Sequence, residues 1–93
     1  MFANSDKLAN SLEQAANASN DIIWRLPLHK PNLKKIESKV ADMDNCGRDR
    51  SAGSIVAALF LSKFTEDYEW SHRDIAGAAM GDFASCKASG RPV

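Results

Sequence analysis

The densest apolar stretch of the chain is the run IVAALFL over residues 55–61. Within it Ile55 and Leu59 are four residues apart, which is the spacing of one face of a helix. Apolar residues on nearly every side indicate a helix that is buried on most of its circumference. We therefore predict a helix over residues 52–65, with Leu59 and Phe60 in the core that gives the domain its stability.

Two further stretches have helical spacing. The first, over residues 5–19, begins at the capping sequence NSD and carries an apolar stripe with polar groups opposite it. The second, over residues 31–38, has a proline in its first turn, where a proline is tolerated. We expect the first to lie on a sheet and the second to lie at the surface. The inward-facing residues would be Leu8, Leu12, Ala15 and Ala16 in the first and Leu33 and Ile36 in the second.

Two segments are rich in strand-forming residues. Residues 22–26 precede Pro27, which cannot donate a hydrogen bond to a sheet, and residues 70–76 precede Gly77, which permits an abrupt turn. We predict a strand in each. Helices alternating with strands indicate the α/β class, and 93 residues allow one domain at most.

Composition narrows the classes of partner. Twelve basic and twelve acidic residues give a net charge of zero, and only a Lys34–Lys35 pair suggests phosphate binding, so we expect no nucleic-acid partner. Seven consecutive apolar residues cannot cross a bilayer, and the first residues do not have the pattern of a signal peptide. We expect a soluble, cytoplasmic chain without a membrane partner.

The cysteines, Asp74 and His72 give little indication of a catalytic or metal site. Cys46 and Cys86 lack a CxxC spacing, and two reduced thiols fit a cytoplasmic chain better than a disulfide does, although the pattern leaves both open. Asp74 is the one acid in a strand expected to be buried, and such a residue more often accepts hydrogen bonds from loop amides than it transfers protons. His72 is similarly expected to be a packed residue and not a ligand.

Residues 70–77 (WSHRDIAG) resemble the WAHLDIAG segment near the C-terminus of the leucyl (cytosol) aminopeptidases. Four other segments match this family in the same order and at similar spacing, so the resemblance covers nearly the whole chain. They are WRLPL at 24–28, NCG at 45–47, RSAG at 50–53 and GRPV at 90–93. The resemblance implies a single partial α/β domain over residues 1–93, the C-terminal portion of a mixed-sheet metalloaminopeptidase catalytic domain.

The family consists of two-metal exopeptidases that release N-terminal amino acids from peptides. The resemblance places their lysine, aspartate and glutamate ligands upstream, several of them in an NTDAEGR signature that is absent here. It therefore implies no catalytic residue and no metal ligand in this chain, and two zinc, manganese or magnesium ions in the intact protein. We expect the chain to be inactive on its own. The family continues past GRP with an apolar helix, which indicates truncation.

What the resemblance carries over is the wall of the substrate pocket. By position, Ala76 and Ala79 line the pocket for the N-terminal side chain, and Cys46 borders the site for the second side chain. For Cys46 a small residue that merely permits a tight turn is an equally good interpretation.

Two functional hypotheses remain open. In the first, the chain supplies pocket wall and subunit contacts to a hexameric peptidase, with a peptide as substrate and the upstream half as partner. In the second, it is a non-catalytic assembly or interaction module derived from that family. One departure from the family bears on both: Arg73 replaces an apolar residue, so it must either reach water or find a compensating acid such as Asp74 or Glu69.

Overall fold

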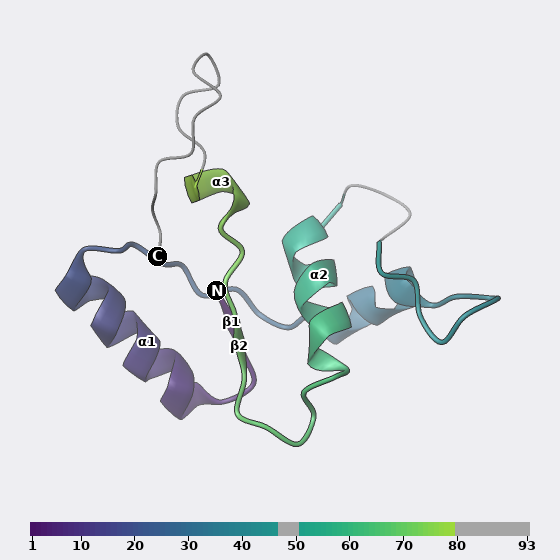
Figure 1. Cartoon of the computed structure of the whole chain (residues 1–93), viewed down its shortest axis with the longest axis horizontal. Coiled ribbons are helices and arrows are strands. Elements are labelled where there is room, and N and C mark those ends of the chain that lie inside the picture. The colour runs from purple at the N-terminus through teal and green to yellow at the C-terminus, as the bar shows by residue number, and fades with distance from the viewer. Residues whose placement is uncertain (47–50, 80–93) are drawn as a thin grey trace, which may run out of the picture.

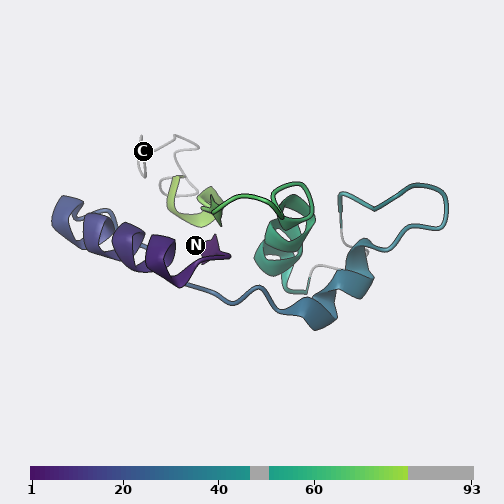
Figure 2. The same ribbon diagram turned by 90° about the horizontal axis from the view of Figure 1, so that it is seen from below.

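The computed structural model describes residues 1–46 and 51–79 of the 93-residue chain. A short sheet lies in the middle, between the N-terminal helix on one side and the helices of residues 30–36 and 53–62 on the other (Figures 1 and 2). The molecule measures 42 × 37 × 17 Å, so it is flat. Its helices and short sheet form a partial α/β domain. The elements in order are β1 (Phe2–Ala3), α1 (Asp6–Ser19), η1 (Lys30–Ile36), α2 (Gly53–Ser62), β2 (Ser71–His72) and α3 (Ala76–Ala79).

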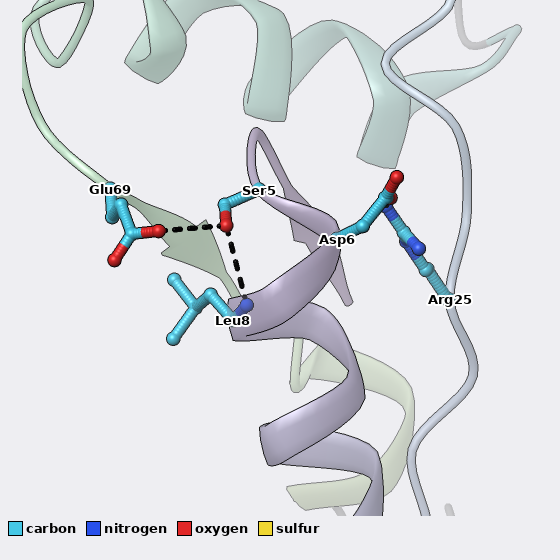
Figure 3. A network of polar contacts seen from close by, with 5 residues as sticks. All are labelled: Ser5, Asp6, Leu8, Arg25 and Glu69. Carbon is cyan, nitrogen blue, oxygen red and sulfur yellow. Dashed lines mark hydrogen bonds and ion pairs between the residues drawn. The ribbon is translucent and has the colours of Figure 1, made fainter.

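Helix α1 confirms the helix predicted over residues 5–19, but of the four residues expected to face inward only Ala16 is buried. Leu8 and Leu12 are half-buried, and Ala15 is exposed. Ser5 caps the helix, because its Oγ accepts a hydrogen bond from the Leu8 N–H at 3.3 Å. The same hydroxyl donates to Glu69 Oε1 at 2.9 Å, which joins the start of the helix to the segment before β2 (Figure 3). Asn20 ends the helix in the left-handed conformation, with φ of 55°, which asparagine tolerates better than most residues.

An ion pair joins α1 to the extended segment that follows it. Arg25 Nη2 lies 2.6 Å from Asp6 Oδ1, in the first turn of the helix (Figure 3). Because the Asp6 side chain is 85% exposed, the pair contributes little to stability. It orients the segment more than it holds the fold together.

The sheet is an antiparallel pair of very short strands. The sequence patterns did not predict the first of them, β1. Phe2 is opposite His72 and Ala3 is opposite Ser71. Asn4 extends the contact: its Nδ2 donates to the Tyr68 carbonyl at 2.7 Å, and its Oδ1 accepts the Trp70 N–H at 2.8 Å. The backbone N–H of Asn4 also donates to the Trp70 carbonyl at 3.2 Å.

The predicted strand over residues 22–26 is wrong, although the segment is extended. Within residues 1–46 and 51–79 its backbone bonds only to Met1: the terminal amine donates to the Trp24 carbonyl at 2.7 Å, and the Leu26 N–H donates to the Met1 carbonyl at 2.9 Å. A strand needs a ladder of such bonds along its length, and the described residues supply only this one partner. Ile22 and Trp24 are accordingly 86% and 79% exposed.

The predicted strand over residues 70–76 is confirmed only at Ser71 and His72, because β1 offers two residues to pair with. Beyond them, Ala76 begins α3, where a strand was expected, and Gly77 lies inside that helix instead of forming an abrupt turn. Asp74 causes the change locally, since its Oδ1 accepts the Ala76 N–H at 3.2 Å and starts a new turn.

Helix α2 confirms the helix predicted over residues 52–65, shortened to Gly53–Ser62, and Leu59 is buried in it at 3% exposure. The helix is buried on a narrower face than expected, since Leu61 is 38% exposed. It packs on η1, where the predicted inward residue Ile36 is also buried. The η1 segment is a 3₁₀ helix and not an α-helix, and at seven residues it is longer than most 3₁₀ helices. Away from the sheet, η1 and α2 therefore pack against each other.

Candidate functional site

The predicted pocket wall is divided between two parts of the molecule. Ala76 begins α3 and is exposed, and Ala79 ends the same helix and is half-buried. Cys46 is an exposed free thiol at the end of a loop. In both ribbon views α2 lies between that loop and α3 (Figures 1 and 2). The structure thus brings Ala76 and Ala79 together and leaves Cys46 apart from them.

Asp74 connects α3 to the start of α2. The Ser54 hydroxyl donates to Asp74 Oδ2 at 2.5 Å, while the Ala76 N–H donates to Oδ1 at 3.2 Å. The hydrogen bond from Ser54, and after it the bond from Ala76, lower the pKa of the Asp74 carboxyl below its ordinary value. The carboxylate therefore stays ionised at neutral pH, and it acts as an acceptor for two segments.

The expected environment of Asp74 was wrong and its expected role was right. The side chain is exposed instead of being buried in a strand, because the chain has left the sheet by this point. It nevertheless accepts a hydrogen bond from a backbone amide, as the sequence suggested, although that amide belongs to the first residue of α3. The second donor, Ser54, was missed: it lies 20 residues away, and no local pattern marks it.

Arg73 has a different partner from the two that the sequence suggested. Its Nη2 lies 2.9 Å from Asp21 Oδ2, and Asp21 is the first residue after the cap of α1. Glu69 instead accepts from Ser5, and Asp74 accepts from Ser54. The charge of Arg73 is therefore paired across 52 residues of sequence.

His72 is a packed residue, as expected. Its ring stacks at 6.1 Å from the ring of Phe2 and at 6.3 Å from that of Trp70, measured between centroids. The two interplanar angles are 23° and 8°, so the three rings form a continuous stack along the sheet. This arrangement gives His72 a structural role at the centre of the molecule.

A hollow of about 280 Å³ opens beside Asp74. Phe2, Trp24 and Ile75 contribute apolar walls, and Ser54, Arg73 and Asp74 contribute polar ones. Ile75, which borders the hollow, is the residue before α3, and a larger hollow of about 420 Å³ lies between residues 41–45 and the rings of Phe60 and Phe64. The hollow beside Asp74 is partly open to solvent, and the exposed Trp24 is among its walls.

The described residues do not fit a metal pair. Among residues 1–46 and 51–79, no three histidine, cysteine, aspartate or glutamate side chains come together in a group that could hold an ion. Over the same ranges no helix has the length and apolar character to cross a membrane. Cys86, the other thiol considered for a disulfide, lies outside the described residues, as do the matches at residues 47, 50 and 90–93.

Comparison with known proteins gives a consistent result. The family profile described as "Cytosol aminopeptidase family, catalytic domain" matches residues 1–93. A probable cytosol aminopeptidase of Legionella pneumophila is 54% identical over 88 residues, which are 95% of this chain and 18% of that protein. One of Ralstonia pickettii is 48% identical over 93 residues, again 18% of its length. The chain therefore spans about a fifth of the curated relatives that it matches.

Solved structures agree. A mutant of tomato leucine aminopeptidase superposes with a TM-score of 0.84 and 38% sequence identity, over 96% of this chain and 18% of that one. The crystal structure of cytosol aminopeptidase from Coxiella burnetii gives a TM-score of 0.64 and 47% identity, over 69% of this chain and 14% of that one. At these identities the similarity concerns sequence and fold together.

Proposed function

We propose, since the chain belongs to the cytosol aminopeptidase family, that it forms the C-terminal portion of the catalytic domain of an exopeptidase that releases N-terminal amino acids from peptides. The observation that carries the proposal is that all 93 residues match the family, and that they correspond to about a fifth of the length of a relative. On this proposal the whole protein acts on peptides in the cytoplasm and holds two divalent metal ions, whose ligands lie in the upstream part.

The role of this portion is to shape the pocket for the substrate. Ala76 and Ala79 lie one helical turn apart on α3, and each presents only a methyl group. Small side chains leave room for a substrate side chain, and the volume they leave decides which side chains enter. Cys46 would border the neighbouring position, for the second residue of the peptide. None of these groups moves a proton, so the chemistry belongs to the upstream residues.

We expect the 93-residue chain alone to bind no pair of divalent ions and to hydrolyse no leucine anilide. A two-metal site needs several ligands that converge on ions about 3.5–4 Å apart, and the described acids are spread over separate elements. Calorimetric titration with zinc and with manganese, alongside an anilide assay, measures both quantities. Tight binding of two ions per chain, or turnover that a chelator abolishes, would contradict this expectation.

A chimeric enzyme tests the pocket wall. We would join this chain to the upstream part of the Legionella pneumophila relative, in place of the matching 88 residues. The chimera should hydrolyse leucine anilide if the portion is functional. Replacing Ala79 by phenylalanine should then lower kcat/KM for leucine and larger N-terminal residues by about tenfold or more, because the new ring occupies their space, and should affect alanine less. Ala15→Phe, on the exposed side of α1, is the matched control. Equal effects on all substrates would argue against a pocket wall at Ala79.

A second function, as an assembly module, is favoured by the exposure of Ile22 and Trp24. Large apolar side chains at 86% and 79% exposure on one extended segment are typical of a surface that another chain covers. Trp24→Ser in the 93-residue chain, with exposed Tyr68→Ser as control, would separate the two functions. If the chain associates and only the first variant dissociates, the segment is an assembly surface. If the chimera is active and the isolated chain is monomeric, the peptidase role stands alone.

A further inference from the structure

We propose that residues 22–24 form a docking site for a β-strand that the upstream part of the protein supplies. The strand runs parallel to this segment, bonds to its backbone and covers the side chains of Ile22 and Trp24. The inference rests on the proposed function, because it takes the rest of an aminopeptidase as the partner. It identifies the surface of this chain through which the two parts join.

The backbone of the extended segment is already paired with one residue in the manner of a parallel sheet. The Trp24 carbonyl accepts a hydrogen bond from the amine of Met1 at 2.7 Å, and the Leu26 N–H donates to the Met1 carbonyl at 2.9 Å. Two bonds from one residue to the neighbours on either side of its partner are the pattern of a parallel bridge, here between Met1 and Arg25. The segment thus lies along the edge of the central sheet at which β1 begins.

The next backbone groups along this edge are the Ile22 carbonyl and the Trp24 N–H. They stand two residues before the groups that bond to Met1, which is the spacing of the next parallel bridge. Within residues 1–46 and 51–79, neither group has a protein partner. An exposed edge with unpaired N–H and C=O groups is a template for another strand. A strand that extends β1 backwards from Met1 meets both groups in register.

The side chains beside this edge suit an apolar partner. Alternate residues of an extended segment point to the same face, and Ile22, Trp24 and Leu26 are all exposed. They border the hollow of about 280 Å³, whose other apolar walls include Phe2 and Ile75. Pockets for small-molecule ligands and cofactors measure about 300–1,000 Å³, so this hollow is better matched to the side chains of a packed strand.

The upstream part of the protein is the occupant that the comparisons favour. The chain matches the catalytic-domain family over all 93 residues but corresponds to 18% of the length of its relatives, so most of such a protein lies outside it. Under the proposed function that part precedes Met1, and its last residues reach Ile22 and Trp24 through the connection of the chain itself. A second copy of this chain has no such connection.

Amide hydrogen exchange in the chimera and in the 93-residue chain tests the strand. In the chain alone the Trp24 N–H should exchange freely, whereas the Leu26 N–H is bonded to Met1 and serves as the internal control. In the chimera we expect exchange at Trp24 to slow about tenfold or more relative to exchange at Leu26. Equal slowing of the two amides would overturn the docking site. Protection of the Trp24 N–H already in the chain alone would also overturn it, because a second copy or another segment of the chain would then occupy the edge.

Replacing Trp24 by alanine tests the apolar contact. In the 93-residue chain the exposed ring contributes little, so the midpoint of urea unfolding should stay the same. In the chimera the same substitution should lower the midpoint, because the upstream strand covers the ring, and Trp24→Phe should retain most of the stability. An unchanged midpoint for the alanine variant of the chimera would contradict the docking site.

Activity distinguishes this inference from the proposed function. A folded chimera in which the Trp24 N–H is protected but leucine anilide is not hydrolysed would overturn the proposed function and support the docking site. An active chimera in which that amide is unprotected would support the function and overturn the docking site. A chimera that does not fold would overturn both, because the upstream part would then not fit this surface.

Discussion

Replacing Phe2 by alanine is expected to lower the free energy of unfolding by about 3–5 kcal/mol, the range for truncation of a buried aromatic residue. Phe2 is the one large side chain in the described core that is completely buried, at 0% exposure. Its ring stacks on His72, and its backbone forms half of the central sheet between α1 and α2 (Figure 1). The substitution would leave a cavity where both halves of the molecule meet.

Urea denaturation followed by tryptophan fluorescence would measure the effect, since Trp70 stacks on His72 in the same cluster. The control is Phe64→Ala, which removes the same ring from a position that is 64% exposed. Because small domains have only about 5–15 kcal/mol of stability, the Phe2 variant would be largely unfolded at modest urea concentrations. Equal midpoints for the two variants would mean that Phe2 does not hold the sheet in solution.

Replacing Leu59 by alanine is expected to cost about 2–5 kcal/mol. Leu59 is 3% exposed at the centre of α2, where the helix packs on η1 and its buried Ile36. The control is Leu61→Ala, two residues along the same helix and 38% exposed, which should cost far less. An unchanged midpoint for the Leu59 variant would mean that α2 packs on a surface outside this chain.

The sequence placed Phe60 in the same core, and the structure lowers the stability cost that we expect from truncating it. Phe60 is half-buried and meets Phe64 edge-on, with ring centroids 5.2 Å apart. A side chain that keeps part of its surface in water loses less when it is truncated. We therefore expect Phe60→Ala to fall below the Leu59 variant in the same denaturation series.

The helices could be predicted from sequence because their signals are local. The capping serine at Ser5 and the four-residue spacing around Leu59 lie inside the elements that they define. The strands could not, because a strand exists only where a partner pairs with it. Residues 22–26 have strand composition but only Met1 to bond to, whereas Phe2 and Ala3 show no pattern and are paired.

The same reasoning applies to the candidate site. Asp74 was recognised as an acceptor because an acid in an apolar segment is unusual in itself. Its partner Ser54 and the partner of Arg73, Asp21, are 20 and 52 residues away, and nothing near either residue marks the pairing. The small residues Ala76 and Ala79 have no chemical signal of their own, so their assignment came from family resemblance and stays a prediction.

The side chain of Asn4 has a consequence for how the chain folds. It bonds to Tyr68 and Trp70, which are 64 and 66 residues further along, and the sheet beside it joins equally distant residues. Closing so long a loop costs chain entropy before any of these bonds forms, while α1 and α2 can form from local contacts. We therefore expect both helices to form early and the junction at Asn4 to close late, so that the time needed for the two ends of the chain to meet sets the folding rate.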